Sequence, residues 1–313
     1  MTSAILSAPS VSVRAPAKVN LELRVGPPRP DGFHPLATVY QAVSLFDQVT
    51  IRAGDDWSVE ISGSRALGVP ADETNLALRA ARLLAERHDI DEPVEIFIDK
   101  EIPVAGGMAG GSADAAATLV ACDWFWDLGL SKEELATVAA ELGSDVPFLL
   151  HGGTALGTGR GEIITPVLTR GTYHWVFAPS DIGLSTPDVY RQFDEHNEAV
   201  GFTPPEPASS PALMAALMSG NPEQLAPVLM NDLEGSAIDL RPELEEIIVE
   251  GRHLGALAGI VSGSGPTIAF LAADHESAID LAVGLTATGV VTDTYRATGP
   301  VPGATIRGVP RVD

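Results

Sequence analysis

Cysteine and long apolar runs are scarce in this chain of 313 residues, and each scarcity excludes a class of protein. A single cysteine, Cys122, rules out an internal disulfide framework and a cysteine-rich metal site. No apolar run approaches the ~20 residues that a membrane-spanning helix needs. The first residues lack both a basic region and a long apolar stretch, so we expect no signal peptide.

Positive charge is also scarce. The chain carries 19 basic and 42 acidic residues, a formal net charge of -23. Nucleic acids and anionic membranes bind basic surfaces, so we expect neither as a partner. The hydrophobic fraction of 45% is enough for a packed core. These features favour a cytoplasmic protein that acts on a small molecule. The lysines are Lys18, Lys100 and Lys132, so a lysine inside a motif is notable.

Hydrophobic periodicity in the first half predicts a mixture of strands and helices. Short β-branched segments predict strands at residues 11–13, 19–25, 39–43, 49–52, 59–61 and 94–99. Helical spacing predicts helices at 75–88, 113–128 and 131–142, the last with a capping box of Ser131 and Glu134. The five glycines of residues 152–164 favour a hairpin.

The second half repeats this mixture. The predicted strands are 174–178, 186–193, 268–272 and 289–296, and the predicted helices are 211–219, 222–229, 242–254 and 276–285. The polar segment 194–211 is expected to be a mobile loop. Because no regular βαβ alternation is present, the expected fold class is α+β. A boundary near residues 165–172 predicts two domains, 1–168 and 169–313.

The segment of residues 103–113 places four glycines between a predicted strand and a predicted helix. Glycines allow close backbone approach, and free N–H groups at a helix N-terminus attract anions, so the segment predicts a phosphate site. It is not a Walker A loop, because Ser112 stands where lysine is required. It is not a Rossmann fingerprint, because residue 105 is alanine and a second helix follows the first.

This segment, PVAGGMAGGSADAA, is similar to the central phosphate-binding motif of the GHMP kinases. Residues 15–21 (APAKVNL) and 261–267 (VSGSGPT) resemble the first and third motifs of that family, in the expected order. The resemblance therefore covers nearly the whole chain and implies a two-domain kinase with its active site between the domains. Residues 31–34 and 143–148 resemble one branch, whose substrate is an alcohol linked to cytidine diphosphate in the non-mevalonate isoprenoid pathway.

The resemblance implies transfer of the γ-phosphoryl group of ATP to the 2-hydroxyl of a methylerythritol group, which needs a base and positive charge. It makes Asp145 the general base and Lys18 the charge beside it. Asn20, two residues after Lys18 in a strand, points to the same face. From the residues alone, a cap of the following turn is the favoured role for Asp145, and Lys18 could be a surface lysine of an edge strand.

The resemblance also implies ATP and Mg²⁺ as cofactors. Ser112 is a candidate Mg²⁺ ligand, Asn75 and Lys100 are candidates for the adenine side, and Gly263, Ser264 and Gly265 would border the phosphates. The residues implied to bind the ATP phosphates are Pro103, Val104, Ala105, Gly106, Gly107, Met108, Ala109, Gly110, Gly111, Ser112 and Ala113.

On the substrate side, His34 resembles a histidine that contacts the cytosine edge with one donor and one acceptor. Phe33 replaces a tyrosine that is common in this branch, so stacking is retained and a hydroxyl contact is lost. Tyr190 is the candidate for the opposite face of the cytosine, and Thr186 resembles a hydroxyl that contacts the substrate. Each of these residues could instead have an ordinary core or turn role.

Two other functions remain open from the sequence. One is a GHMP kinase of the homoserine or mevalonate type, whose substrate carries no base and gives Phe33, His34 and Tyr190 no task. The other is a catalytically silent sensor of a nucleotide or sugar, which would not need Lys18 and Asp145. The oligomeric state is not indicated.

Overall fold

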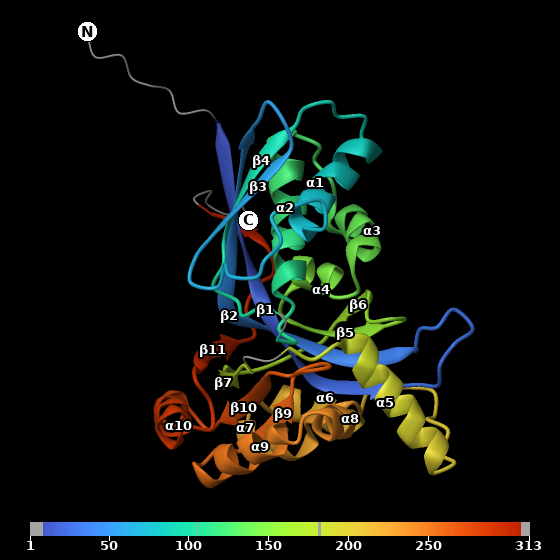
Figure 1. Ribbon diagram of the computed structural model, residues 1–313, viewed down its shortest axis with the longest axis vertical. Helices are drawn as coiled ribbons and strands as arrows, with labels where there is room; N and C mark the ends of the chain where they lie inside the picture. The colour runs from blue at the N-terminus through green and yellow to red at the C-terminus, as the bar shows by residue number, and fades with distance from the viewer. Residues whose placement is uncertain (1–8, 105, 181–182, 308–313) are drawn as a thin grey trace.

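The computed structural model describes residues 9–104, 106–180 and 183–307. Two β-sheets lie one above the other along the long axis of the molecule, each with helices packed against it (Figure 1). Strands and helices are mixed, which confirms the predicted α+β class. None of the helices in the described part of the chain is long and apolar enough to cross a bilayer.

The larger sheet is built on two long antiparallel strands, β1 (Ser10–Val25) and β2 (Leu36–Ala53). The sequence predicted four short strands here, and that division is wrong. At the register shift between Pro16 and Ala17, Ser44 and Leu45 of β2 are left without partners in β1, and the ladder continues past the proline. The sheet is completed by β4 (Val94–Asp99), β3 (Ser58–Ser62), and the predicted hairpin of β5 (Thr154–Thr158) and β6 (Ile163–Pro166).

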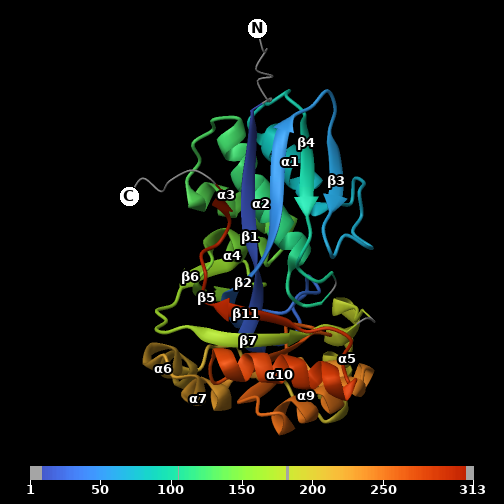
Figure 2. The same ribbon diagram turned by 90° about the vertical axis from the view of Figure 1, so that its left-hand side faces the viewer.

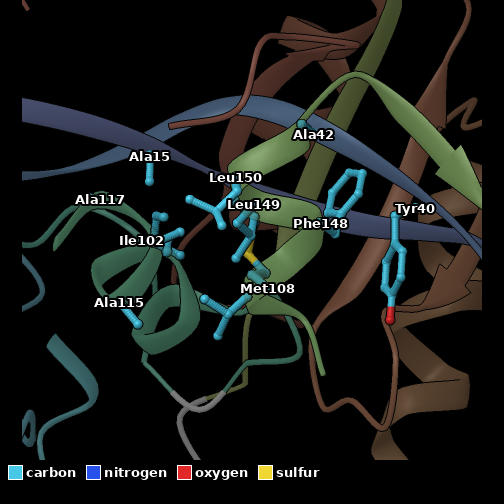
Figure 3. Packing of buried hydrophobic residues seen from close by; sticks show 14 of the residues in the cluster. Ala15, Tyr40, Ala42, Ile102, Met108, Ala115, Ala117, Phe148, Leu149 and Leu150 are labelled. Carbon is cyan, nitrogen blue, oxygen red and sulfur yellow. The ribbon is translucent and has the colours of Figure 1, made fainter. Parts of the chain in front are cut away.

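Helices cover one face of this sheet (Figure 1). They are α1 (Leu76–Arg87), α2 (Gly110–Phe125), α3 (Lys132–Leu142) and α4 (Val146–His151). The predicted capping box of Ser131 and Glu134 is present at α3. Helix α2 begins at Gly110, earlier than predicted. Helix α2 lies in the main hydrophobic core, part of which Figure 3 shows. Its small side chains, such as Ala115 and Ala117, are fully buried there.

The smaller sheet has the order β11 (Tyr295–Gly299), β7 (Tyr173–Ala178), β10 (Ile268–Ala272) and β9 (Ala258–Val261). Its strands cross the lower ends of β1 and β2 (Figure 2). The helices of this half are α5 (Thr186–Ala199), α6 (Pro211–Ser219), α7 (Pro222–Leu225), α8 (Glu234–Leu240), α9 (Glu243–His253) and α10 (His275–Thr288), with a 3-10 turn at Ala226–Val228.

Helix α5 corrects two predictions, the strand at 186–193 and the beginning of the mobile loop at 194–211. Pro187 fits the first helical turn, where its missing N–H costs nothing. The buried residues Val189 and Phe193 are four positions apart, which is helical spacing. Strand propensity of Val189, Tyr190 and Phe193 misled the local interpretation, and burial of one helical face outweighs it.

The two halves of the chain are joined through the larger sheet. Two short strands from the second half, β8 (Met230–Asn231) and β12 (Thr305–Ile306), both pair with β1. The predicted boundary at residue 168 falls between β6 and β7 and stays a prediction. The architecture brings the middle of β1, the end of β8 and the turn before β10 to one place.

Candidate active site

A cavity of about 870 Å³ lies where the two halves meet, a size that suits a nucleotide-sized ligand. Its walls come from β1, β2, the glycine-rich segment, the start of α4, helix α5 and the turn at 263–265. The structure brings to it these residues from the sequence analysis: Lys18, Asn20, Phe33, His34, Gly106, Gly107, Ala109, Gly110, Gly111, Ser112, Asp145, Thr186, Tyr190, Gly263, Ser264 and Gly265.

The glycine-rich segment is held from both halves of the chain. Gly107 has a φ of +74°, and a Cβ there would lie 2.1 Å from the carbonyl oxygen of Ser262. The Ser262 hydroxyl donates to the Gly107 carbonyl at 3.0 Å. The main-chain N–H of Lys18 donates to the Met108 carbonyl at 3.2 Å. Glycine is therefore required at 107 so that the segment can approach the third motif.

Helix α2 opens toward the cavity with an uncapped N-terminus. Ala109 precedes it with a φ of +62° and provides no side-chain cap. Gly110, Gly111 and Ser112 form the first turn and line the cavity. The first N–H groups of a helix lack intrahelical acceptors, so this turn presents donors and the positive end of the helix dipole to a bound anion.

Four of the predicted ATP-binding residues of this segment do not line the cavity, and their contact with ATP stays a prediction. Pro103, Met108 and Ala113 are buried in the interior, and Val104 is 42% exposed on the surface. Ala105 lies outside the described residues. Among the described residues, the part of the segment that lines the cavity therefore begins at Gly106.

Lys100 does not line the cavity, and its predicted role at the adenine stays a prediction. Its side chain is 2% exposed, and its ammonium donates to the carboxylates of Asp47 and Asp114. Asp47 in turn accepts main-chain N–H bonds from Glu101 at 2.7 Å and Ile102 at 2.9 Å. Burial alone would lower the pKa of Lys100, but the two carboxylates outweigh it and raise that pKa. The lysine therefore acts inside the fold.

Asn75, the other adenine candidate, caps helix α1. Its Oδ1 accepts the main-chain N–H groups of Ala77 at 2.9 Å and Leu78 at 3.4 Å, and its Nδ2 donates to the Pro70 carbonyl. It is 4% exposed and does not line the cavity. These hydrogen bonds hold Asn75 as a helix cap, and its predicted contact with ATP stays a prediction.

The Lys18 ammonium lies beside the Asp145 carboxylate, with Nζ 3.9 Å from Oδ2. Lys18 Nζ also donates to Asn20 Oδ1 at 2.7 Å, and Asn20 Nδ2 donates to the Thr38 hydroxyl at 2.8 Å, so the amide fixes the lysine. A Cβ at Gly263 would lie 3.1 Å from Lys18 Nζ, so a glycine leaves room for the ammonium. Burial lowers the pKa of Lys18, and the Asp145 charge offsets part of that effect.

Asp145 occupies the N-cap position of α4, but its side chain makes no capping hydrogen bond. The carboxylate is 30% exposed and lines the cavity. Burial, followed by the charge of Asp145, raises the pKa of Tyr40 well above its ordinary value. Tyr40 therefore remains a neutral phenol beside that carboxylate. The Asp145 side chain therefore does not have the capping role that the sequence left open.

Tyr40 was missed by the sequence analysis. It pairs with Asn20 across β1 and β2, which puts both side chains on the same face of the sheet. Its ring stacks on Phe148 of α4 with centroids 4.8 Å apart, as Figure 3 shows. Tyr40 could be found only from the register in which β1 and β2 pair, and a single sequence does not reveal that register.

The predicted base-binding residues form another part of the wall. His34 is 7% exposed, and its Nδ1 lies 2.8 Å from the Gly26 carbonyl oxygen. This corrects the expectation that both ring nitrogens face a ligand, because only Nε2 remains available. The Tyr190 ring lies 5.2 Å from the His34 ring, and burial raises the pKa of Tyr190. Phe33 is half exposed, with the Arg160 guanidinium 5.0 Å from its ring centroid.

Helix α5 is tied to the third motif, since the hydroxyls of Thr186 and Ser264 lie 2.7 Å apart. The same helix adds Arg191 and Asp194 to the cavity wall. Both were missed because a strand and a loop were expected here. With helical spacing, Thr186, Tyr190 and Asp194 fall four residues apart on one face. The cavity-lining polar residues missed by sequence are Tyr40, Ser144, Arg160, Arg191 and Asp194.

Two family models match this chain. The model described as GHMP kinases N terminal domain matches residues 75–153, and GHMP kinases C terminal matches residues 213–291. The first match contains the glycine-rich segment and Asp145, and the second contains the turn at 263–265. The chain therefore belongs to the GHMP kinase family.

Individual relatives narrow the comparison. The chain is 54% identical to the 4-diphosphocytidyl-2-C-methyl-D-erythritol kinase of Nocardia farcinica, over 95% of this chain and 96% of that protein. A crystal structure of 4-(cytidine 5'-diphospho)-2C-methyl-D-erythritol kinase matches with a TM-score of 0.74 and 32% identity, covering 92% and 98% of the two chains. Homoserine kinase from Cytophaga hutchinsonii has a TM-score of 0.72 at 20% identity over 98% and 99%, and shows only the shared fold. The predicted family and its cytidine-diphosphate branch are confirmed.

Proposed function

We propose that the chain transfers the γ-phosphoryl group of ATP to the 2-hydroxyl of 4-(cytidine 5'-diphospho)-2-C-methyl-D-erythritol, in the non-mevalonate isoprenoid pathway. The observation that carries the proposal is the pair of Lys18 and Asp145, 3.9 Å apart, in the same cavity as the open N-terminus of α2. The pair of Lys18 and Asp145 acts on the acceptor hydroxyl, and the N-terminus of α2 binds the phosphates. We place this reaction in the cytoplasm, without nucleic acid or membrane partners.

In this proposal Asp145 accepts the proton of the substrate hydroxyl while the oxygen attacks phosphorus. Its carboxylate is free of a capping bond and accessible from the cavity, as a general base requires. Lys18 stabilises the negative charge that develops on the attacking and transferred oxygens. Asn20 holds Lys18, and the neutral phenol of Tyr40 lies beside the carboxylate. Each group is positioned before the substrate arrives.

The phosphates of ATP would lie against the first turn of α2 and the glycines before it. No cluster of three or more acidic, histidine or cysteine ligands occurs in the described part of the chain. Mg²⁺ that arrives with ATP keeps several waters and needs few protein ligands, so the Ser112 hydroxyl in that first turn fits such an ion. When bound, Mg²⁺ neutralises charge on the phosphate oxygens.

The base-binding wall distinguishes this function from its nearest rivals. Homoserine and mevalonate carry no base, and they leave His34, Tyr190 and Phe33 without a ligand. A coupled ADP-release assay should therefore show turnover with the cytidylated erythritol and none above background with homoserine or mevalonate. Equal turnover with a substrate that lacks a base would contradict the proposed substrate.

Asp145→Asn separates catalysis from binding. The amide keeps the shape of the carboxylate but cannot accept the proton, so turnover should fall by roughly 10²–10⁴ while ATP binding persists. Asp91→Asn, in the exposed loop before β4, is the matched control and should retain full activity. A fully active Asp145→Asn enzyme would remove Asp145 from the mechanism, and a silent sensor would show no turnover in the parent chain either.

A further inference from the structure

Asn231 is a buried amide behind the cavity wall. It is 8% exposed, belongs to β8, pairs with Leu23 of β1, and does not line the cavity. Its Nδ2 donates to two main-chain carbonyls, those of Val261 at 2.8 Å and Gly263 at 2.7 Å. Its Oδ1 accepts the main-chain N–H of Leu233 at 2.9 Å. Both hydrogens of the amide are therefore used, and the side chain is fixed in one orientation.

The segment that carries Asn231 is anchored to the long strand β1. The carboxylate of Asp232 accepts the main-chain N–H of Val25 at 3.0 Å. Further along the segment, the Glu234 carboxylate accepts the main-chain N–H of Val261 at 2.8 Å. Val261 is therefore held at its N–H by Glu234 and at its carbonyl by Asn231. Strand β1 determines through this segment where the turn at 263–265 lies.

The turn itself needs the two hydrogens of the amide. Gly263 and Gly265 have φ values of +62° and +79°, which glycine adopts readily, and the Gly265 N–H donates to the Ser262 carbonyl at 3.0 Å. The carbonyls of Val261 and Gly263 converge on a single nitrogen. Only a group with two hydrogens on one atom satisfies both of them, and an aspartate of the same shape has none to give.

The turn contacts the part of the cavity where Lys18 lies. A Cβ at Gly263 would lie 3.1 Å from Lys18 Nζ. Because the peptide that joins Gly263 to Ser264 is trans and planar, the Ser264 N–H points opposite to the carbonyl that Asn231 holds. That N–H has no acceptor among the described residues, and Ser264 lines the cavity. The turn therefore presents an unused donor near the Lys18 ammonium.

We propose that Asn231 is a positioning residue for phosphoryl transfer, which holds the Gly263 carbonyl and so directs the Ser264 N–H at the terminal phosphate of ATP. The terminal phosphate is the target because the neighbouring Lys18 ammonium lies beside the Asp145 carboxylate. N–H donors that are fixed before the reaction stabilise developing negative charge without any rearrangement. This inference rests on the proposed function in taking ATP to bind with its terminal phosphate at Lys18.

Nucleotide binding without catalysis tests the inference. Asn231→Asp keeps the shape of the side chain but places a carboxylate oxygen against two carbonyl oxygens, so the turn should move. Titration calorimetry at saturating Mg²⁺ should show that the Kd of adenylyl imidodiphosphate, a non-hydrolysable ATP analogue, rises about tenfold. The Kd of ADP, which lacks the terminal phosphate, should stay within about twofold. The number of binding sites per chain should not change, and kcat should fall about 10²-fold.

Asn231→Ala keeps the test available if the buried carboxylate prevents folding, because it leaves room for a water that can donate to both carbonyls. A water is held less firmly than the amide, so the Kd of the analogue should rise about 3- to 10-fold, again without a change for ADP. Asn221→Asp is the matched control, since Asn221 caps α7 and does not line the cavity. It should leave both Kd values unchanged.

A purely structural role for Asn231 predicts a different result, because a misfolded site loses affinity for both nucleotides alike. An equal rise of both Kd values in the Asn231 variants, or no rise for the analogue in either variant, would overturn the inference. A selective loss of the analogue in a chain that does not turn over the cytidylated erythritol would contradict the proposed function and leave this inference standing.

Discussion

At the scale of single residues, Lys18 shows how the candidate site conflicts with stability. Its side chain is 4% exposed, and the closest partners of its ammonium are the neutral Asn20 amide and a carboxylate 3.9 Å away. Burying a charge without a close counter-ion is costly, and burial lowers the pKa of this lysine accordingly. Gly263 leaves the space that the ammonium occupies. The site keeps a charge there that the fold alone would not favour.

Lys18→Met should abolish turnover and raise the free energy of unfolding at neutral pH by about 0.5–2 kcal/mol. The folded-state pKa of Lys18 lies below its ordinary value near 10.5, so the unfolded chain holds more protons on this group between those two values. The destabilisation is full below the folded-state pKa and disappears as the pH approaches 10.5. The gain of the variant should therefore shrink toward that pH.

Urea denaturation from neutral pH to about pH 10 would measure this effect, within the range where lysine ordinarily begins to lose its proton. Lys132→Met provides the control, because Lys132 is an exposed lysine at the start of α3 and should change stability little at any pH. A Lys18→Met variant that unfolds more easily than the parent chain at neutral pH would show that the buried ammonium contributes net stability.

Residues within short motifs were predictable, whereas residues joined by tertiary contacts were not. Lys18, Asp145 and Gly107 stand in contiguous patterns whose chemistry is local. Tyr40 reaches the site through the pairing of two strands, and Asp194 reaches it through the periodicity of a helix mistaken for a strand and a loop. Nor does the place of Lys100 just before the glycine-rich segment reveal that its ammonium pairs with the buried carboxylates of Asp47 and Asp114.

At the scale of elements, the buried cluster of Lys100, Asp47 and Asp114 joins the end of β4 to β2 and α2. A Cβ at Gly110 would lie 3.2 Å from Lys100 Nζ, so the ammonium lies directly against the first turn of α2. Asp47 also holds the main chain just before the glycine-rich segment. The cluster therefore fixes both sides of the turn that faces the phosphates.

Lys100→Met should lower the free energy of unfolding by about 3–5 kcal/mol, because two carboxylates lose their buried counter-ion. Asp114→Asn should change it by no more than about 1 kcal/mol. Asp47 still pairs with the Lys100 ammonium in that variant, and Asp114 Oδ1 has no hydrogen-bond partner to lose among the described residues. Urea denaturation would measure the free energy of unfolding of both variants. Equal losses in the two variants would contradict this expectation.

At the scale of the whole molecule, fold class and family were predictable because three motifs occur in order along the chain. The pairing of strands from the second half with β1 was not predictable, because β8 and β12 are two-residue strands without a hydrophobic pattern. Those strands pair with β1, and the Ser262 hydroxyl bonds to the Gly107 carbonyl. Both halves of the chain therefore contribute walls to one cavity, and the site depends on both.

The net charge of -23 raises the question of how the molecule binds two strongly anionic ligands. Among the described residues, the cations that line the cavity are Lys18, Arg160 and Arg191, and the carboxylates of Asp145 and Asp194 lie among them. Side-chain charge therefore contributes little net attraction. The uncapped turn of α2 and the Mg²⁺ that accompanies ATP would supply most of the neutralisation.

Binding through backbone N–H groups predicts a weak effect of salt on ATP affinity at saturating Mg²⁺. Surface charges more than about 10 Å away are already screened at ~0.1 M ionic strength, and amide donors release no counter-ions when they bind. The KM for ATP should therefore change by less than about twofold between ~0.1 M and ~0.4 M potassium chloride. Steady-state kinetics over that range would measure it, with Arg191→Gln as a comparison that removes one lining cation. A tenfold or steeper rise in KM for the parent chain would mean that arginine side chains, and not the helix N-terminus, hold the phosphates.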